Sequence, residues 1–273
     1  TIKSVAEKAG VSIASVSRVI NGTVARGDTE ERVWKAIKEL DYQPNSAARA
    51  LKVRKSEQIC LSFDDLGNPA YVMMTRGVGQ ALSSTDYRLV LSSAFSSVDE
   101  IVKHLETMGR GFADGLIISP IYSDSRITKL LSRLQIPVVV VGTLPNGIDV
   151  DNVWVDSSAG VATAVAHLKD TGRKKIGFLN GPIATNPGKK RVAAFLKAMD
   201  SNSLKLTTTS VIQAEAFSPE AAYSAVKEHS KISNFDSIVC ANDQLAAGLM
   251  KFCFENKIDI PADLAVVGID NTD

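Results

Sequence analysis

The sequence predicts an all-α head followed by an α/β body of two lobes with parallel sheets. Three observations predict this fold class. Residues 1–55 show only helical hydrophobic spacing. From Gln58 onward, apolar runs rich in β-branched residues alternate with helical stretches, as in sheets that are covered on both faces. The length of 273 residues is enough for about two domains.

The composition is that of a folded protein with a large core, since 45% of the residues are hydrophobic and 22% are charged. No apolar run reaches the roughly 20 residues that cross a bilayer. Thr1 opens a polar helical pattern where a secretion signal would be apolar, so we expect a cytoplasmic protein. Cys60, Cys240 and Cys253 form no CxxC pair, which predicts buried, reduced thiols and no zinc site.

The net charge of +1 hides an asymmetry between the head and the body. Residues 1–55 hold 11 basic and 6 acidic residues, whereas residues 56–273 hold 20 basic and 24 acidic residues. A basic head on a mildly acidic body suggests that only the head meets a polyanion. The alternative is a chance excess of solvated lysines, which charge alone does not exclude.

We expect the head to begin with two short helices. The first runs over Ile2–Ala9, with Thr1 as its N-cap and Gly10 at its end. The second follows an N-cap at Ser12 and ends at Asn21-Gly22. Its inward-facing residues are Val16, Val19 and Ile20.

A third helix is expected after an N-cap at Asp28, because acidic residues follow in its first turn. Its apolar face is Val33, Trp34, Ile37 and Leu40. A turn then leads to a short Ala-rich helix over Ser46–Val53. So short a helix is marginal alone in water, and we expect it to form conditionally.

The Gly10-Val11-Ser12 turn between two short helices is typical of a helix-turn-helix. The outward positions of its second helix are Ile13, Ala14, Ser15, Ser17 and Arg18. Small and hydroxyl side chains allow a helix to approach DNA closely, and an arginine can donate two hydrogen bonds to guanine. The alternative is a helical hairpin of an unrelated bundle.

The body reads as strands that alternate with helices. The expected strands are Ile59–Phe63, Leu89–Ser92, Gly115–Ser119, Pro137–Val141, Val153–Val155, Ile176–Leu179, Ser237–Ala241 and Leu264–Ile269. The expected helices include Val98–Met108, Ala159–Thr171, Arg191–Met199, Pro219–His229 and Leu245–Glu255. The turn-rich stretch Thr143–Asn152 is the expected crossing between the lobes.

Long sequence strings in both parts carry a family resemblance. In the head, residues 1–22 read TIKSVAEKAGVSIASVSRVING and residues 31–51 read ERVWKAIKELDYQPNSAARAL. In the body, IGFLNGP stands at 176–182, ANDQLAAG at 241–248 and VVGIDN at 266–271. With these strings the chain resembles the LacI/GalR family of bacterial transcription regulators. The body is similar to that family's two-lobed, periplasmic-binding-protein-like effector domain.

The resemblance implies that the helix around Ser12–Asn21 reads the major groove of DNA. It also implies a hinge helix over Ser46–Lys52 that folds on DNA as a dimer forms, with Leu51 wedged into the minor groove. The alternatives are a core role for Leu51 and a helix C-cap role for Asn21. The expected DNA-binding residues are Ser12, Ile13, Ala14, Ser15, Ser17, Arg18, Asn21, Tyr42, Asn45, Arg49 and Leu51.

The resemblance further implies that Arg191, Asn242 and Asp270 hydrogen-bond an effector, with Tyr71 and Phe217 beside it. In open α/β sheets, ligands bind outside the carboxyl ends of the strands, near which the three polar residues are expected. The alternatives are helix or turn caps for Asn242 and Asp270, a surface ion pair for Arg191 and a core position for Phe217. The family pattern differs here at Thr185, Pro187 and Gly142, which leaves the ligand class open.

These observations predict a ligand-responsive DNA-binding regulator, a repressor of carbohydrate-utilisation genes that binds a pseudo-palindromic operator as a homodimer. The alternatives are a purine- or nucleoside-responsive regulator of the same fold and an extracytoplasmic sugar-binding protein. An enzyme is not expected: GxGxxG and GxSxG are absent, and Gly181–Lys190 has the wrong spacing for a P-loop. We expect neither a cofactor nor a metal.

The expected domains are a helix-turn-helix domain over residues 1–45 and a hinge helix with linker over 46–56. The first lobe of the effector domain is expected over 57–152 and the second over 153–273. Because family members continue beyond the last residue here, we expect the second lobe to be incomplete at its C-terminal end.

Overall fold

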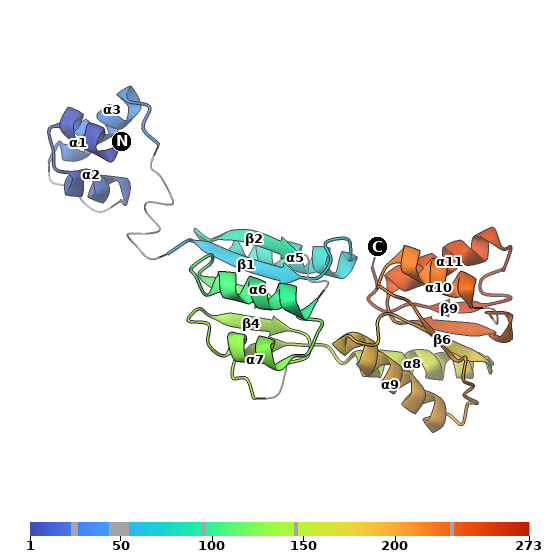
Figure 1. Ribbon diagram of the computed structural model, residues 1–273. Coiled ribbons are helices and arrows are strands. Elements are labelled where there is room, and N and C mark those ends of the chain that lie inside the picture. Colours follow the sequence, from blue (N-terminus) through green and yellow to red (C-terminus); the bar gives the residue numbers. More distant parts are fainter. Residues whose placement is uncertain (23–26, 44–54, 94–96, 145–146, 230–231, 273) are drawn as a thin grey trace. The chain divides into compact units, whose positions relative to one another are not determined.

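The computed structural model describes residues 1–22, 27–43, 55–93, 97–144, 147–229 and 232–272 (Figure 1). The chain divides into two compact units, Thr1–Ser56 and Glu57–Asp273, and each is described by itself. The helix expected over Ser46–Val53 lies outside the described residues.

The described residues of the head form three helices around one small core. The helices are α1 (Ile2–Ala9), α2 (Ile13–Ile20) and α3 (Thr29–Glu39). The Thr1 hydroxyl accepts a hydrogen bond from the Ser4 amide, and Gly10 closes α1 in the left-handed region at φ 65°. The small core comprises Val5, Ala6, Ala9, Val16, Val19, Val33 and Ala36. The expected bounds of α1 and α2 are therefore confirmed.

Helix α3 corrects two details of the sequence prediction. Asp28 stands at the N-cap position, but its side chain makes no capping hydrogen bond and instead lies 3.3 Å from Arg32. Trp34 and Leu40 are not part of the buried face, since they are 47% and 39% exposed. Ala36 is buried in their place, because so small a core leaves a narrow apolar stripe on each helix.

The first lobe of the body is a parallel sheet in the order β2-β1-β3-β4-β5. Its strands are β1 (Gln58–Phe63), β2 (Arg88–Ser93), β3 (Gly115–Ile118), β4 (Val138–Val141) and β5 (Asp151–Val153). Its helices are α5 (Pro69–Leu82), α6 (Val98–Met108) and α7 (Ser125–Leu131). Helices α6 and α7 pack against each other over a core that includes Leu105, Leu116 and Ile127 (Figure 1).

The second lobe is a parallel sheet in the order β7-β6-β8-β9. Its strands are β6 (Ile176–Asn180), β7 (Val211–Gln213), β8 (Ser237–Cys240) and β9 (Ala265–Val267). Its helices are α8 (Ser157–Asp170), α9 (Asn186–Ser201), α10 (Pro219–Glu228) and α11 (Asp243–Glu255), with a 3-10 turn over Ile232–Asn234. Helices α8 and α9 pair on one side of the sheet, and α10 and α11 pair on the other (Figure 1).

The connection between the two sheets follows β5 and so differs from the expected crossing over Thr143–Asn152. Val153, expected to start a strand, instead ends β5, whose pairing with β4 keeps it in the first sheet. Trp154, which is 62% exposed, belongs to the segment that leads on to α8. Turn residues mark the bend before β5, but they do not reveal that a three-residue edge strand follows.

All three cysteines are free and buried, as expected. Burial raises the pKa of each thiol, which makes the reactive thiolate scarce. None of the helices in the described part of the chain combines the length and the apolar character that a membrane span requires.

Candidate functional site

The outer face of α2 is the expected DNA-reading surface. Ile13 is 48% exposed, and Ser12, Ala14, Arg18 and Asn21 are exposed as well. Ser15 and Ser17 are partly buried at the sides of the same helix. Because Val16 and Val19 hold the opposite face in the core, this face is presented outward with a defined orientation.

Two of these residues also stabilise the ends of α2. The Ser12 hydroxyl accepts a hydrogen bond from the Ser15 amide at 3.1 Å, which makes Ser12 the helix N-cap. The side-chain amide of Asn21 donates to the Ser17 carbonyl at 2.7 Å. Asn21 therefore adopts the helix C-cap role, which is the alternative to a DNA contact. Tyr42 is partly buried against the head core. The expected contacts Asn45, Arg49 and Leu51 lie outside the described residues.

The residues of the second lobe that are expected to bind an effector begin with Arg191 on α9. The helix is fixed at its start by the buried Thr185, whose hydroxyl accepts from the Gly188 amide at 3.1 Å and donates to the Pro182 carbonyl at 2.6 Å. A Cβ at Gly188 would lie 2.1 Å from the Pro182 carbonyl oxygen, so this close approach requires glycine. One turn beyond Arg191, Phe195 stacks on Phe178 with ring centroids 4.9 Å apart.

Arg191 faces Asp270, which follows β9. The distance from Arg191 Nη2 to Asp270 Oδ1 is 4.0 Å, and the two side chains are only 15% and 20% exposed. Burial lowers the pKa of Arg191 and raises the pKa of Asp270, and each effect is opposed by the charge of the partner. The Arg191 Nε is buried and has no hydrogen-bond partner among the described residues.

The segment that carries Asp270 is held by Asp243, the first residue of α11. The Asp243 carboxylate accepts hydrogen bonds from the Thr272 amide at 2.8 Å and hydroxyl at 3.1 Å. A Cβ at Gly268 would lie 2.2 Å from Asp243 Oδ1, so a larger residue there would displace the carboxylate that holds Thr272. Asp270 itself has φ 117°, a strained conformation for a residue with a side chain.

Tyr71 comes from α5 of the first lobe. Its ring stacks on Phe63 with centroids 4.7 Å apart and planes 7° apart, so one ring face is already covered. Burial raises the pKa of Tyr71, and so does the nearby Asp64, whereas Arg191 of the second lobe lowers it. The charge of Arg191 therefore acts on Tyr71 across the two lobes.

Asn242 and Phe217 lie at the same ends of the second sheet but are engaged locally. Asn242 is 2% exposed, and its side-chain oxygen caps α11 by accepting from the Leu245 amide at 2.9 Å. Phe217 is partly buried against the core, with its ring directly over Gly181, where a Cβ would come within 2.3 Å of a ring carbon. The structure therefore pairs Arg191 with Asp270 directly, whereas Asn242 and Phe217 contact their own neighbourhoods.

The sequence reasoning missed Asp64 and Ser119. Asp64 directly follows β1, and Ser119 directly follows β3. The Tyr71 hydroxyl lies 3.4 Å from the Ser119 hydroxyl and hydrogen-bonds Asp64. Both residues follow or end expected strands, so the rule that ligands bind at the carboxyl ends of parallel strands is the signal that could have found them.

A direct contact between the lobes lies beside these residues. The Asn186 amide donates to the Ile121 carbonyl at 2.7 Å, and the Ser123 hydroxyl donates to Asn186 Oδ1 at 2.7 Å. Asn186 is the first residue of α9, so the helix that carries Arg191 is joined to the loop after β3.

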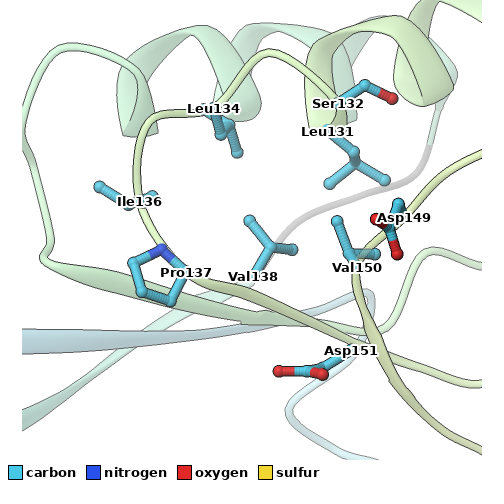
Figure 2. Close-up of a pocket in the computed structure, with 9 residues that line it drawn as sticks. All are labelled: Leu131, Ser132, Leu134, Ile136, Pro137, Val138, Asp149, Val150 and Asp151. Carbon is cyan, nitrogen blue, oxygen red and sulfur yellow. The ribbon is translucent and has the colours of Figure 1, made fainter.

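An open pocket of about 380 Å³ lies away from this site (Figure 2). It lies at the amino ends of β4 and β5, where Leu131, Leu134 and Val138 form an apolar wall beside Asp149 and Asp151 (Figure 2). None of the residues expected to bind an effector lines it. In the described part of the chain, no group of three or more histidine, cysteine or acidic side chains could hold a metal ion.

Two family models match the chain. Residues 1–45 match the model of bacterial regulatory proteins of the lacI family, and residues 165–273 match a periplasmic binding protein-like domain. Among solved structures, the lac repressor dimer bound to operator and the anti-inducer ONPF has a TM-score of 0.84 at 24% identity, covering 100% of this chain and 83% of that one. A complex of the transcriptional regulator CelR with cellobiose has a TM-score of 0.70 at 27% identity, with the same coverage.

Curated relatives match along nearly the whole chain. The HTH-type transcriptional repressor PurR of Proteus mirabilis is 31% identical over 99% of this chain and 80% of its own length. PurR of Haemophilus influenzae (strain PittEE) is 32% identical over 99% of this chain and 81% of its own length. These relatives are repressors and not enzymes. The helix-turn-helix head, the two-lobed effector domain and these matches together show that this chain belongs to the LacI family and is a ligand-responsive, DNA-binding transcriptional repressor.

Proposed function

We propose that this repressor controls carbohydrate-utilisation genes in the cytoplasm and that its effector is a carbohydrate. The effector binds at the carboxyl ends of the two sheets, where Arg191, Asp270 and Asn242 hydrogen-bond it. Tyr71 and Phe217 lie beside its ring. Ligand binding that favours one arrangement of the lobes changes the affinity for DNA, since two sites couple only through states that bind the ligand differently.

The observation that supports this proposal best is the Arg191–Asp270 pair with the unpartnered Nε of Arg191. Buried polar atoms in native proteins are nearly always hydrogen-bonded, so a buried donor without a partner suggests a bound ligand. An arginine and a carboxylate offer planar, two-point contacts that suit adjacent hydroxyls of a sugar. The similarity to CelR, solved with cellobiose, also supports a sugar.

The second candidate effector is a purine or a nucleoside. It is favoured by the relatives named PurR and by the two aromatic rings near the site. A nucleobase would stack on the ring of Tyr71 or of Phe217. The two candidates differ in what they require: a base needs an aromatic face, whereas a sugar needs paired donors and acceptors.

A thermal-shift screen of the protein against sugars and nucleosides decides between the candidates. A ligand present at 100 times its Kd stabilises the folded state by about 2.7 kcal/mol, which raises the melting temperature measurably. Stabilisation by a sugar supports the carbohydrate proposal. Stabilisation by a purine or nucleoside alone overturns it in favour of the second candidate.

The repressor binds a pseudo-palindromic operator as a homodimer in this proposal, because a two-fold protein matches a two-fold site. Met250 and Phe254 support a dimer, since they lie one turn apart on α11 and are 51% and 85% exposed. An exposed apolar pair of this kind is typical of an interaction surface.

The salt dependence of DNA retardation tests the role of the head. Residues 1–55 carry a net charge of +5, so neutralising phosphates releases counterions and the affinity for duplex DNA falls steeply with salt. A flat salt response would contradict a DNA-binding role for the basic head.

A further inference from the structure

Asp64 presents an unused acceptor to the effector site from the first lobe. Its Oδ1 is buried and has no hydrogen-bond partner among the described residues. The Ser119 and Tyr71 hydroxyls lie 3.4 Å apart, and Tyr71 hydrogen-bonds Asp64. Burial raises the pKa of Asp64, and the hydrogen bonds that its carboxylate accepts from Tyr71 and from the backbone of Asp64 and Asp65 oppose this rise. A buried carboxylate oxygen is costly without a donor, so a ligand that donates a hydrogen bond is favoured here.

The charged groups of the site do not favour an anionic ligand. Arg191 is the cation that faces Asp270 and acts on Tyr71, and the carboxylates Asp64 and Asp270 accompany it. Sites for phosphate gather several cationic or amide donors. A phosphate monoester near Arg191 would instead meet two carboxylates and one cation.

The start of α9, beside Arg191, is also closed to phosphate, because its backbone donors are already used. The Asn186 amide donates to the Ile121 carbonyl at 2.7 Å, and Pro187 has no amide hydrogen. The Gly188 amide donates to the Thr185 hydroxyl at 3.1 Å, and the Lys189 amide donates to the Thr185 carbonyl at 3.0 Å. Helix N-termini bind anions through such amides, and none is left here.

We propose that the effector is a neutral, polyhydroxylated molecule and that Asp64 is the residue that selects it over its phosphate ester. The proposal rests on the effector site proposed above. A ligand hydroxyl donates to Asp64 Oδ1 from one lobe, and an oxygen of the same ligand accepts from Arg191 Nε of the other. Vicinal hydroxyls satisfy both, since each hydroxyl is a donor and an acceptor.

The test compares neutral compounds with their own phosphate esters on the full chain by thermal shift, followed by calorimetric titration. The pairs are glucose and glucose 6-phosphate, ribose and ribose 5-phosphate, cellobiose and its monophosphate, and adenosine and AMP. We expect a neutral member to bind, and its ester to bind at least about tenfold more weakly. A phosphate ester that binds more tightly than its neutral partner, or a panel without any neutral ligand, overturns the inference.

The variant Asp64→Asn tests the residue itself, and Asp65→Asn is its matched control. Asp65 is exposed, and its Oδ1 accepts from the Gly67 amide at 2.7 Å, which an asparagine preserves. We expect Asp64→Asn to reduce the preference for the neutral compound about tenfold. Asp65→Asn should change it much less, because the Asp65 carboxylate is exposed and acts on Asp64 only through its charge. Asp64→Ser provides a second neutral variant with a smaller side chain. An unchanged preference in both Asp64 variants, or an equal loss in Asp65→Asn, would assign the selection to other groups.

The outcomes separate this inference from the proposed function. Binding of glucose 6-phosphate over glucose would leave a carbohydrate effector in place and overturn the selection by Asp64. Binding of adenosine alone would overturn the carbohydrate proposal and leave the selection for a neutral ligand in place.

Discussion

Arg191 interacts electrostatically with residues of both lobes of the body. It stands on α9 of the second lobe, faces Asp270 at 4.0 Å and acts on the pKa of Tyr71 from the first lobe. Its side chain is 15% exposed and is held by a helix whose start is locked by Thr185. A charge in such a position costs desolvation energy, which a ligand that pairs with the free Nε offsets.

Replacing Arg191 by alanine should abolish the response to ligand. In the wild type we expect the effector to change operator affinity at least about tenfold. In Arg191→Ala the effector should leave operator affinity unchanged, because the guanidinium that donates hydrogen bonds to the effector is lost. Operator retardation across an effector titration measures this. Lys189→Ala, two residues away and exposed, is the control and should respond normally. A normal response in Arg191→Ala would remove the residue from the site.

At the residue scale, the sequence was informative where a motif string surrounds the residue. Arg191, Asp270 and Tyr71 came from the family resemblance, and the structure brings them together. Asp64 and Ser119 carry no motif, and an acid or a serine after a strand is common in loops. Their role depends on a Tyr71 hydroxyl from α5, which is a tertiary contact that no local pattern encodes.

At the scale of elements, helix pairs of the second lobe depend on glycine. Gly248 of α11 lies against α10, where a Cβ would come within 2.2 Å of the Pro219 carbonyl oxygen and 2.7 Å of Ala222 Cβ. Backbone cannot move aside as a flexible side chain can, so the two helices would have to separate.

We expect Gly248→Ala to lower the free energy of unfolding by about 1–3 kcal/mol, as overpacking does. Gly160→Ala in α8 is the matched control, since a Cβ at Gly160 would meet no neighbouring atom within 4 Å. There, alanine should stabilise the helix by about 0.5–1 kcal/mol through its higher helix propensity. Urea unfolding of both variants measures the two effects. Similar changes of the same sign in the two variants would contradict the steric role of Gly248.

His104 joins three elements of the first lobe. Its Nε2 lies 2.7 Å from the Ser62 hydroxyl of β1, and its Nδ1 lies 3.3 Å from the Ser92 hydroxyl of β2. From α6 the ring therefore bridges two neighbouring strands. The sequence could not predict these partners, because they depend on the parallel register that sets Ser62 beside Ser92.

Acid should destabilise the first lobe through His104. Burial lowers the pKa of His104 in the folded state, so the unfolded chain binds the proton first as pH falls below about 6.5. Stability that is present at neutral pH is then lost progressively toward lower pH. Urea midpoints between pH 7.5 and 5 (roughly the range of a histidine) should fall less in His104→Gln than in the wild type. His167→Gln, at an exposed position on α8, should keep the slope of the wild type.

The order of the elements was predictable because hydrophobic period and strand–helix alternation are local properties. Helix α6 begins and ends where the sequence predicts. The three-residue strand β7 was missed, and α9 begins five residues before the predicted Arg191. Both depend on tertiary context, since β7 is defined by pairing with β6 and α9 by the capping of Thr185.

At the scale of the whole molecule, the basic head and the two-lobed body differ in the partners they suit. The head carries the proposed DNA-reading face on α2, and the proposed effector site lies at the carboxyl ends of the two parallel sheets of the body. In the proposed homodimer two heads contact one two-fold operator, so operator affinity should depend on self-association as well as on α2.

Phe254→Ser should weaken the proposed dimer. An 85% exposed phenylalanine beside the exposed Met250 contributes apolar area only if a second copy covers it. We expect the dimer dissociation constant to rise at least about tenfold, as measured by sedimentation equilibrium. Leu196→Ser on α9, at a residue that is 40% exposed, is the control. Unchanged self-association in Phe254→Ser would exclude α11 from the interface.

The two tryptophans give the molecule a pair of natural fluorescent reporters. Trp34 is the indole of the head, on α3, and Trp154 is the indole of the segment that follows β5 and leads into the second lobe. Both rings are about half exposed or more, so their emission is sensitive to changes in the surrounding water. A variant that keeps only Trp34 would report occupancy of DNA, and one that keeps only Trp154 would report rearrangement of the lobes. DNA binding and lobe rearrangement can therefore be timed separately by stopped flow, one in each variant, without an attached dye.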